Sequence, residues 1–294
     1  MTGGEAPRGG HLRHMTPGDL AVVLGLAGVP EEHHAEAIGR DPGLVERTLA
    51  SPEAADLLLG DGAGDPDREA LVRASPFLTF AVAVERVREE LREATYVQEW
   101  VGPRQRIPLL GADDLRELLA DGERRVFLAA LLASYTRVAS GSVWRATPRG
   151  WRRRRFSELD PVGLAATLDA LPESRHPAVH RRLGDLALFL AGVFPDHTDA
   201  RAFRPIDLQR LGRAAAVSGT SGEVLGDALE ARGGVGLLET LGPRWYRLAA
   251  RRRPSTPPGM LDAVADRFSE ARRVLNVLAD RHLFVVVREW FPAP

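Results

Sequence analysis

An apolar run that contains a single carboxylate most constrains the fold of this chain. Residues 183–194 read Leu-Gly-Asp-Leu-Ala-Leu-Phe-Leu-Ala-Gly-Val-Phe, and Asp185 is their only charged side chain. A helix that is apolar on all sides belongs inside a protein, so the run predicts a central core helix. Gly184 and Gly192 would let neighbouring helices approach closely. We expect Asp185 to be paired, because an unpaired buried carboxylate shifts its pKa and becomes neutral.

Helix-start signals recur along the rest of the chain. Thr16-Pro17, Ser75-Pro76 and Asp160-Pro161 each place a capping side chain directly before a proline, which is typical of a helix start. Apolar residues at helical spacing follow these signals. We therefore expect an all-α fold, a bundle-like array of many helices.

Four segments depart from the pattern of amphipathic helices or leave their local structure open. The charges of residues 85–93 alternate in sign, which predicts an exposed helix face. Residues 96–107 contain Gly and Pro and predict an irregular or weakly extended connection. Residues 233–236, Gly-Gly-Val-Gly, fit a connection between helices, because a dinucleotide loop needs a preceding strand. Residues 282–290 are open to helix or strand, and the lack of a partner strand favours helix.

The pattern predicts two packed helical halves. Residues 142–158 contain Gly, Ser, Pro and a run of charges without helical periodicity, which predicts a linker. The expected divisions are a disordered tail at 1–14, an N-terminal half at 15–141, this linker, and a C-terminal half at 159–291. The core helix would lie at the centre of the C-terminal half.

Composition limits the classes of protein that fit. The 294 residues are 44% hydrophobic and 27% charged, with a formal net charge of −1, so the whole chain has no charge-driven attraction to nucleic acid or anionic lipid. Cysteine is absent, which excludes disulfides and thiolate chemistry. All 39 cationic side chains are Arg, which a GC-rich genome explains. The apolar runs are too short to span a membrane, so we expect a soluble, cytoplasmic protein.

A basic run between two aromatic residues is the strongest charge feature. Trp151 and Phe156 enclose Arg152, Arg153, Arg154 and Arg155. Four guanidinium groups beside an aromatic ring can hold phosphates while the ring stacks on a base. The alternative is a solvated linker whose arginines pair locally with nearby acids such as Glu158.

Other constellations give weaker signals for chemistry. Asp185 is a candidate ligand-binding acid, with His180 and Arg181 as neighbours on the same helix. The alternative is that Arg181, one turn before Asp185, forms a local ion pair with it. His176 and His180 have the spacing of a metal-binding pair, but Asp185 lies off their face and no third ligand is apparent. We therefore expect no metal, no cofactor and no catalytic residue.

One segment carries a resemblance. The string from Arg182 to Asp196, with its Gly-Asp pair, apolar helix and Gly-x-Phe exit, resembles a segment of uncharacterised all-helical bacterial proteins. The resemblance implies a helical fold and no catalytic residue, and it assigns no activity.

The absence of reaction motifs favours a non-catalytic protein, an interaction or regulatory scaffold with a protein partner. Two alternatives stay open. One is binding of nucleic acid or phosphate through Arg152–Arg155, and the other is a small-molecule enzyme or binding protein that uses Asp185.

Overall fold

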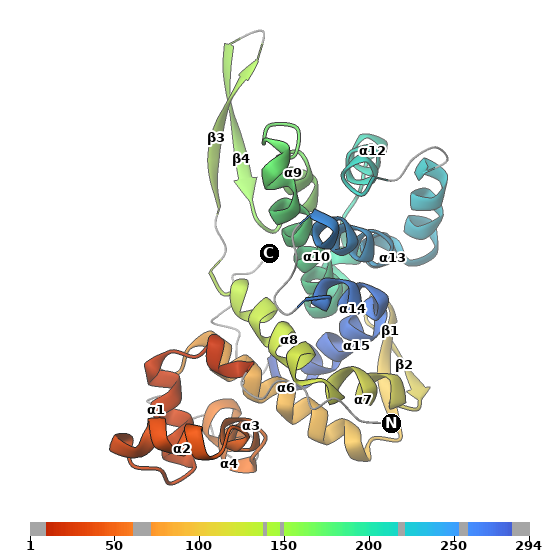
Figure 1. Cartoon of the computed structure of the whole chain (residues 1–294). Coiled ribbons are helices and arrows are strands. Elements are labelled where there is room, and N and C mark those ends of the chain that lie inside the picture. Colours follow the sequence, from red (N-terminus) through yellow and green to blue (C-terminus); the bar gives the residue numbers. More distant parts are fainter. Residues whose placement is uncertain are drawn as a thin grey trace. The chain divides into compact units, whose positions relative to one another are not determined.

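Helices dominate the described residues, as the sequence predicts, and two two-stranded sheets accompany them (Figure 1). The computed structural model describes residues 10–60, 72–137, 140–147, 150–216, 221–252 and 258–283. For the strand residues between 140 and 156, for 221–223 and for 252, it describes only the backbone. These residues form two compact units. Unit 1 takes those between 10 and 98, 108–136 and 277–283, and unit 2 takes 99–107 and those between 137 and 276.

Unit 1 packs short helices beside one long helix. Its core lies along α6 and α8, whose apolar faces contact each other. Its α-helices are α1 (Pro17–Leu26), α2 (His34–Arg40), α3 (Leu44–Leu49), α4 (Pro52–Leu59), α6 (Pro76–Glu93), α7 (Asp113–Ala120) and α8 (Gly122–Ser134). The 3-10 turns η1 (His11–Arg13) and η2 (Glu31–His33) and the π-helical turn η4 (Ala279–Leu283) complete it.

The helix caps predicted for unit 1 are present, and a buried aspartate joins two of them. The Thr16 side chain accepts a hydrogen bond from the backbone of Asp19, and the Asp19 carboxylate accepts one from the backbone of Thr16. The same carboxylate accepts hydrogen bonds from the backbone N and the hydroxyl of Ser75, each at 2.7 Å. Ser75 in turn caps α6. The starts of α1 and α6 are therefore held together by one side chain.

The expectation of a disordered tail at 1–14 is wrong for its last residues, which are ordered. His11–Arg13 form η1, and His11 is buried. The ring of His14 stacks on Phe77, and Arg13 pairs with Glu123 at 2.9 Å. These contacts with α6 and α8 order a segment whose polar composition alone predicts disorder. Residues 1–9 lie outside the described part of the chain.

Unit 2 is built around the predicted core helix. This helix, α10, makes its most extensive contacts with α13. The α-helices of the unit are α9 (Pro161–Ala165), α10 (His176–Val193), α11 (Pro195–Ala200), α12 (Pro205–Ala214), α13 (Ser221–Arg252), α14 (Met260–Asp266) and α15 (Phe268–Leu278), of which the last two residues fall in unit 1. The turn η3 (Glu173–Arg175) precedes α10. Helix α13 is interrupted at Arg232 and Gly233, as predicted for a connection there, and Gly233 has a positive φ of 55°.

Two segments predicted as irregular form strands. Residues 96–107, expected to be irregular or weakly extended, lie largely within β1 (Tyr96–Gly102) and β2 (Gln105–Leu110), which pair with each other. The linker expected at 142–158 is wrong as a local structure, because β3 (Ser140–Thr147) and β4 (Gly150–Ser157) pair antiparallel there. Val, Thr, Trp and Phe in this segment favour extended backbone, whereas the prediction of a linker was based on the Gly, Ser, Pro and charged residues of the segment.

The observed units differ from the expected halves in three respects, of which the first is that residues 99–107, expected in the N-terminal half, belong to unit 2. The main boundary between the two units lies near residue 136. Residues 277–283 belong to unit 1, although the sequence predicts them in the C-terminal half. Residues 282 and 283 belong to η4, and the remainder of the 282–290 segment lies outside the described residues. No helix of the described residues is both long enough and apolar enough to cross a membrane.

Candidate functional site

The apolar run is the buried helix that the sequence predicts. Leu183, Leu186 and Leu188 on α10 are each 0% exposed. A Cβ at Gly184 would lie 2.6 Å from Cδ1 of Tyr246, and a Cβ at Gly192 would lie 2.6 Å from Cβ of Leu275. Only hydrogen fits at either position, because real Cβ atoms do not approach carbon so closely. Both glycines therefore admit neighbouring helices, α13 and α15, as expected.

Asp185 is paired, and its principal partner is distant in sequence. The buried hydroxyl of Tyr246, on α13, donates a hydrogen bond to Oδ1 of Asp185 at 2.9 Å. Nε of Arg181 lies 3.8 Å from Oδ2, while Arg182 pairs with Glu158 at 3.1 Å. The Asp185 side chain is only 13% exposed. Burial raises the pKa of this carboxyl, and Arg181 and the Tyr246 hydroxyl partly offset that effect.

The three candidate ligand residues do not converge on one cavity. His180 lines a pocket among α9, α10, α12 and α13, with its ring 6.2 Å from that of His176. Asp185 and Arg181 are not among the residues that line it. The pairing with Tyr246 favours an architectural role for Asp185, and its use as a ligand-binding acid stays a hypothesis.

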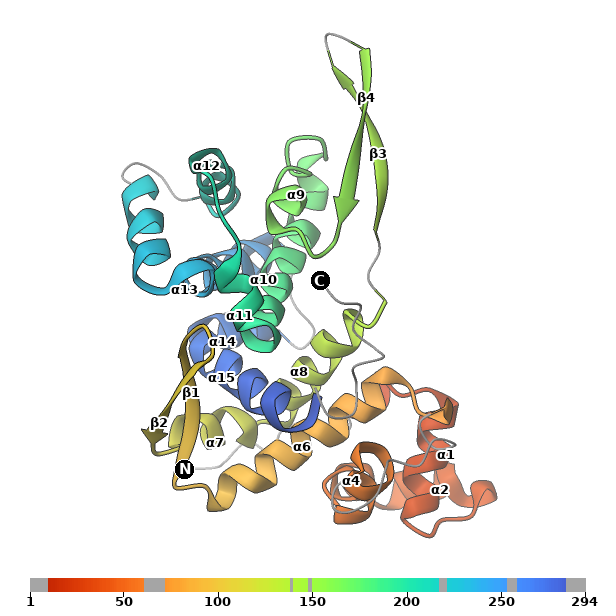
Figure 2. The ribbon, with the colours of Figure 1, turned by 180° about the vertical axis from the view of Figure 1, so that it is seen from behind.

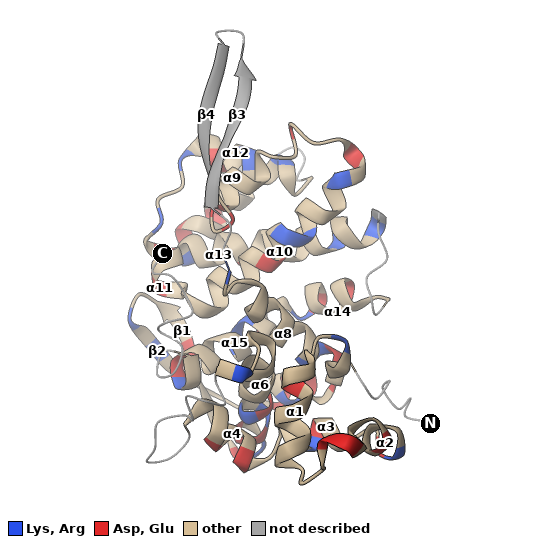
Figure 3. Cartoon of the chain, turned by 90° about the vertical axis from the view of Figure 1, so that its left-hand side faces the viewer, with Lys and Arg blue, Asp and Glu red and all other residues tan. Residues whose placement is uncertain are grey.

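The basic run lies on a β-hairpin. Trp151 and Arg152–Arg155 all belong to β4, and their partners on β3 run from Ala146 back to Ser142. Figures 1 and 2 show the two strands extending away from the helices of unit 2, with the connecting ends farthest from α9. Figure 3 shows acidic and basic residues interspersed along the described helices, with both signs on α3 and on α10. The hairpin departs from that mixture by sequence, because it contains only basic charges.

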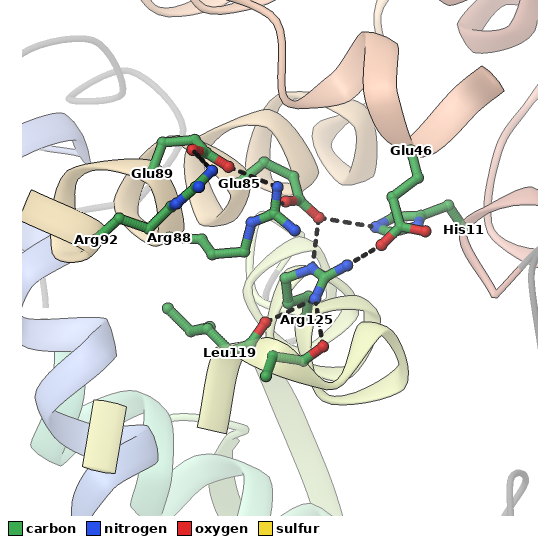
Figure 4. Close-up of polar contacts among 9 residues, drawn as sticks. His11, Glu46, Glu85, Arg88, Glu89, Arg92, Leu119 and Arg125 are labelled. Atoms are coloured by element: carbon green, nitrogen blue, oxygen red, sulfur yellow. Dashed lines mark hydrogen bonds and ion pairs between the residues drawn. The ribbon is translucent and has the colours of Figure 1, made fainter. Parts of the chain in front are cut away.

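A buried charge cluster in unit 1 escaped the sequence interpretation (Figure 4). Glu85 was expected on an exposed face, and this is wrong, because its side chain is 0% exposed. Nε of Arg125, on α8, donates to Oε1 of Glu85 at 2.6 Å, and its other nitrogens contact Glu46 and the carbonyls of Leu119 and Ala120. Leu78 and Glu85 are seven residues apart, so spacing alone places Glu85 on the apolar face of α6.

The electrostatics of this cluster follow from its burial. Burial raises the pKa of Glu85 to about 7, although Arg88, at 3.0 Å, opposes the shift. Burial lowers the pKa of His11 to about 4, and the charge of Arg125 adds to that effect. Nε2 of His11 lies 4.0 Å from Oε1 of Glu85. The buried groups of the cluster pair with one another, which favours a structural network, and its outer members Glu46 and Arg88 line a pocket at the surface.

A second buried cation organises unit 2. Arg272, on α15, is 0% exposed and donates to Glu239 at 2.5 Å, to Glu99 and to Asn276. Nδ2 of Asn276 donates to the carbonyl of Gly192 at 2.6 Å. This network links β1, α10, α13 and α15. No sequence signal indicated it, because Glu99, Gly192 and Glu239 are far from Arg272 along the chain.

Neither a metal-binding group nor a known relative assigns an activity to the described part of the chain. Among the described residues, no three His, Asp or Glu side chains are grouped so that they could hold a metal ion. Comparison with known protein families, curated proteins and solved structures finds no match to this chain. The resemblance of the segment from Arg182 to Asp196 therefore stays a prediction.

Proposed function

We propose that this protein is a non-catalytic binding protein that contacts nucleic acid through the β3–β4 hairpin. The observation that carries the proposal is that β3 and β4 pair as a hairpin in a segment whose only charged residues are arginines. Residues 140–157 contain six arginines and no Asp or Glu, whereas the whole chain has a formal net charge of −1. A local excess of cations in a nearly neutral chain favours a local polyanionic partner.

The register distributes the arginines over both faces of the hairpin. Directly opposite residues share a face, and successive residues of a strand alternate between faces. Trp144 is opposite Arg153, and Ala146 is opposite Trp151. One face therefore takes Trp144, Trp151, Arg153 and Arg155. The other takes Arg145, Arg152, Arg154 and Phe156.

The face with both tryptophans fits a single strand better than a duplex. Guanidinium groups bind phosphates, and indole rings stack on unpaired bases without regard to their sequence. Base stacking of this kind contributes about 1–3 kcal/mol per base. Bases in a duplex are already stacked and offer only their edges. We therefore expect single-stranded DNA or RNA of mixed sequence to bind more tightly than the corresponding duplex.

Fluorescence anisotropy with a labelled single-stranded oligonucleotide tests the proposal. The logarithm of the association constant should fall linearly with the logarithm of the salt concentration. Substitution of Arg152–Arg155 by Gln should reduce the slope by about 3, since each lost contact to a single strand contributes about 0.7. Arg153→Gln with Arg155→Gln should weaken binding more than Arg152→Gln with Arg154→Gln, because the first pair shares a face with the tryptophans.

A charge-matched control separates the hairpin from the general surface. Arg40 and Arg92 are 75% and 70% exposed on helices of unit 1, so Arg40→Gln with Arg92→Gln removes two charges elsewhere. Binding should survive in this control. Equal loss in the control and the hairpin variants would exclude the hairpin as the binding site, and no binding at low salt to single or double strands would exclude nucleic acid as the partner. The protein partner of a scaffold would then be the interpretation to pursue.

A further inference from the structure

A pocket lined by apolar and basic side chains opens among four helices of unit 2. Its volume is about 300 Å³, which is at the lower end of the range for small-molecule sites. Apolar side chains come from α9 and the turn after it, from α12 and from α13. They are Ala165, Leu168, Ala214, Leu248 and, in the turn after α12, Ala216. This lining suits a small apolar body.

Four basic side chains and one acid complete the lining. Arg210 and Arg213 are three residues apart on α12, so they share one face of that helix. His176 and His180 line the pocket from α10, one turn apart. Nε2 of His176 lies 3.0 Å from the carbonyl of Leu171, which fixes the orientation of its ring. Asp169 supplies the acid.

Neither guanidinium group forms a close ion pair within the described part of the chain. No described carboxylate lies within 4.0 Å of a nitrogen of Arg210 or Arg213. Nε of Arg210 is buried and has no hydrogen-bond partner among the described residues. The nearby Asp207 forms its ion pair with Arg204 at 3.1 Å, and Arg210 acts on it only through a longer-range charge interaction. Two arginines against one acid leave the pocket with an excess of positive charge.

We propose that this pocket binds a small organic anion, an apolar body that carries a phosphate or carboxylate group. Guanidinium groups pair with both kinds of oxyanion through parallel N–H donors. The apolar lining would cover the body of the ligand, while Arg210 and Arg213 would bind its charged end. This site is separate from the hairpin and does not depend on nucleic-acid binding.

Ligand-observed NMR titration with three probes tests the proposal on the full chain. Phenyl phosphate carries both features, benzyl alcohol has the apolar body without charge, and inorganic phosphate has the charge without the body. Phenyl phosphate should bind most tightly of the three. Arg210→Gln with Arg213→Gln should weaken its binding at least tenfold, whereas Arg175→Gln, an exposed position outside the lining, should change it less than twofold.

A second variant guards against an effect of misfolding. Leu168 is only partly buried, so Leu168→Asp should leave the fold intact by circular dichroism while it places a carboxylate in the pocket. It should weaken phenyl phosphate binding at least fivefold. Equal binding by wild type and both pocket variants, or no saturable binding of phenyl phosphate, would overturn the proposal. The variant with Arg152–Arg155 replaced by Gln should bind phenyl phosphate as the wild type does, which keeps failure of this site distinct from failure of the hairpin.

Discussion

The hydroxyl of Tyr246 donates to the carboxylate of Asp185 across the contact between α13 and α10, at 2.9 Å. The same tyrosine ring packs against Gly184, which precedes Asp185 in the chain. One side chain thus accounts for both the polar residue and the small residue in an otherwise apolar part of α10. The Gly-Asp pair fixes how α13 lies on the core helix of unit 2.

Loss of the Tyr246 hydroxyl should destabilise the protein. Tyr246→Phe leaves the Asp185 carboxylate with Arg181 at 3.8 Å as its remaining partner among those described above. We expect the free energy of unfolding in urea to fall by about 1–3 kcal/mol, the cost of a buried acceptor that loses its donor. Tyr96→Phe is the control, because Tyr96 is 48% exposed and should give no measurable change. The assignment fails if the two variants are equally stable.

A methyl group at position 184 should be costly for a different reason. Its carbon would lie 2.6 Å from the Tyr246 ring, so α10 and α13 must move apart. Gly184→Ala should destabilise by about 1–3 kcal/mol, as overpacking of a core does. Gly25 lies within α1, and a methyl group there would have no other atom within 4 Å, so Gly25→Ala should stabilise by about 0.5–1 kcal/mol. Thermal unfolding measures both, and equal shifts of the same sign would contradict the steric account.

The sequence predicts those features of both units that depend on local pattern. The burial of residues 183–194 follows from their uniform apolar character. The caps at Thr16, Ser75 and Asp160 follow from a side chain and a proline that are adjacent in the chain, and all three are present. The partner of Asp185 did not follow, because 61 residues separate it from Tyr246. Local charge predicted Arg181, and this residue does form an ion pair with Asp185 at 3.8 Å.

The residues whose structure the sequence did not predict share one property: contacts with distant parts of the chain decide their environment. Glu85 begins a run of alternating charges, yet its position on α6 places it toward Arg125. Arg210 and Arg213 look like ordinary surface residues of an amphipathic helix, and only the fold shows that residues of α9, α10 and α13 line the same pocket. The strands at 140–157 were missed because charge received more weight than the β-forming residues between the charges. Periodicity gives the faces of elements, whereas their partners require the fold.

The raised pKa of Glu85 sets the sign of a pH effect. An unfolded Glu loses its proton near its ordinary value of 4.5, whereas folded Glu85 keeps it until about pH 7. Folding therefore favours the protonated form, and this contribution to stability declines as the pH rises from 4.5 to 7. Arg125, Arg88 and His11 face the carboxyl group and stay in place in Glu85→Gln. The wild type should lose about 3 kcal/mol relative to that variant across this range.

Urea unfolding of both proteins at several pH values measures this difference. His11 has a lowered pKa, so its own contribution falls as the pH drops from 6.5 to 4, in both proteins alike. Glu89→Gln is the control on the same helix, because hydrogen bonds from Arg92 and Arg88 outweigh the slight burial of Glu89 and lower its pKa. A difference between wild type and Glu85→Gln that is constant or grows with pH would mean that the pair with Arg125 dominates.

Arg272 should be the most costly cation to remove. Its side chain is 0% exposed, and Glu99 and Glu239 are 9% and 8% exposed, so truncation leaves two nearly buried carboxylates without their shared partner. We expect Arg272→Ala to lower the free energy of unfolding by about 3–5 kcal/mol, as removal of one member of a buried ion pair does. Arg273 pairs with the same Glu99 at 2.8 Å but is 29% exposed, and Arg273→Ala should cost at most about 1 kcal/mol. Urea denaturation measures the free energy of unfolding of both variants, each of which lacks one positive charge. If both cost the same, solvent reaches the carboxylates of Glu99 and Glu239 freely, and the network around Arg272 does not hold β1, α13 and α15 together.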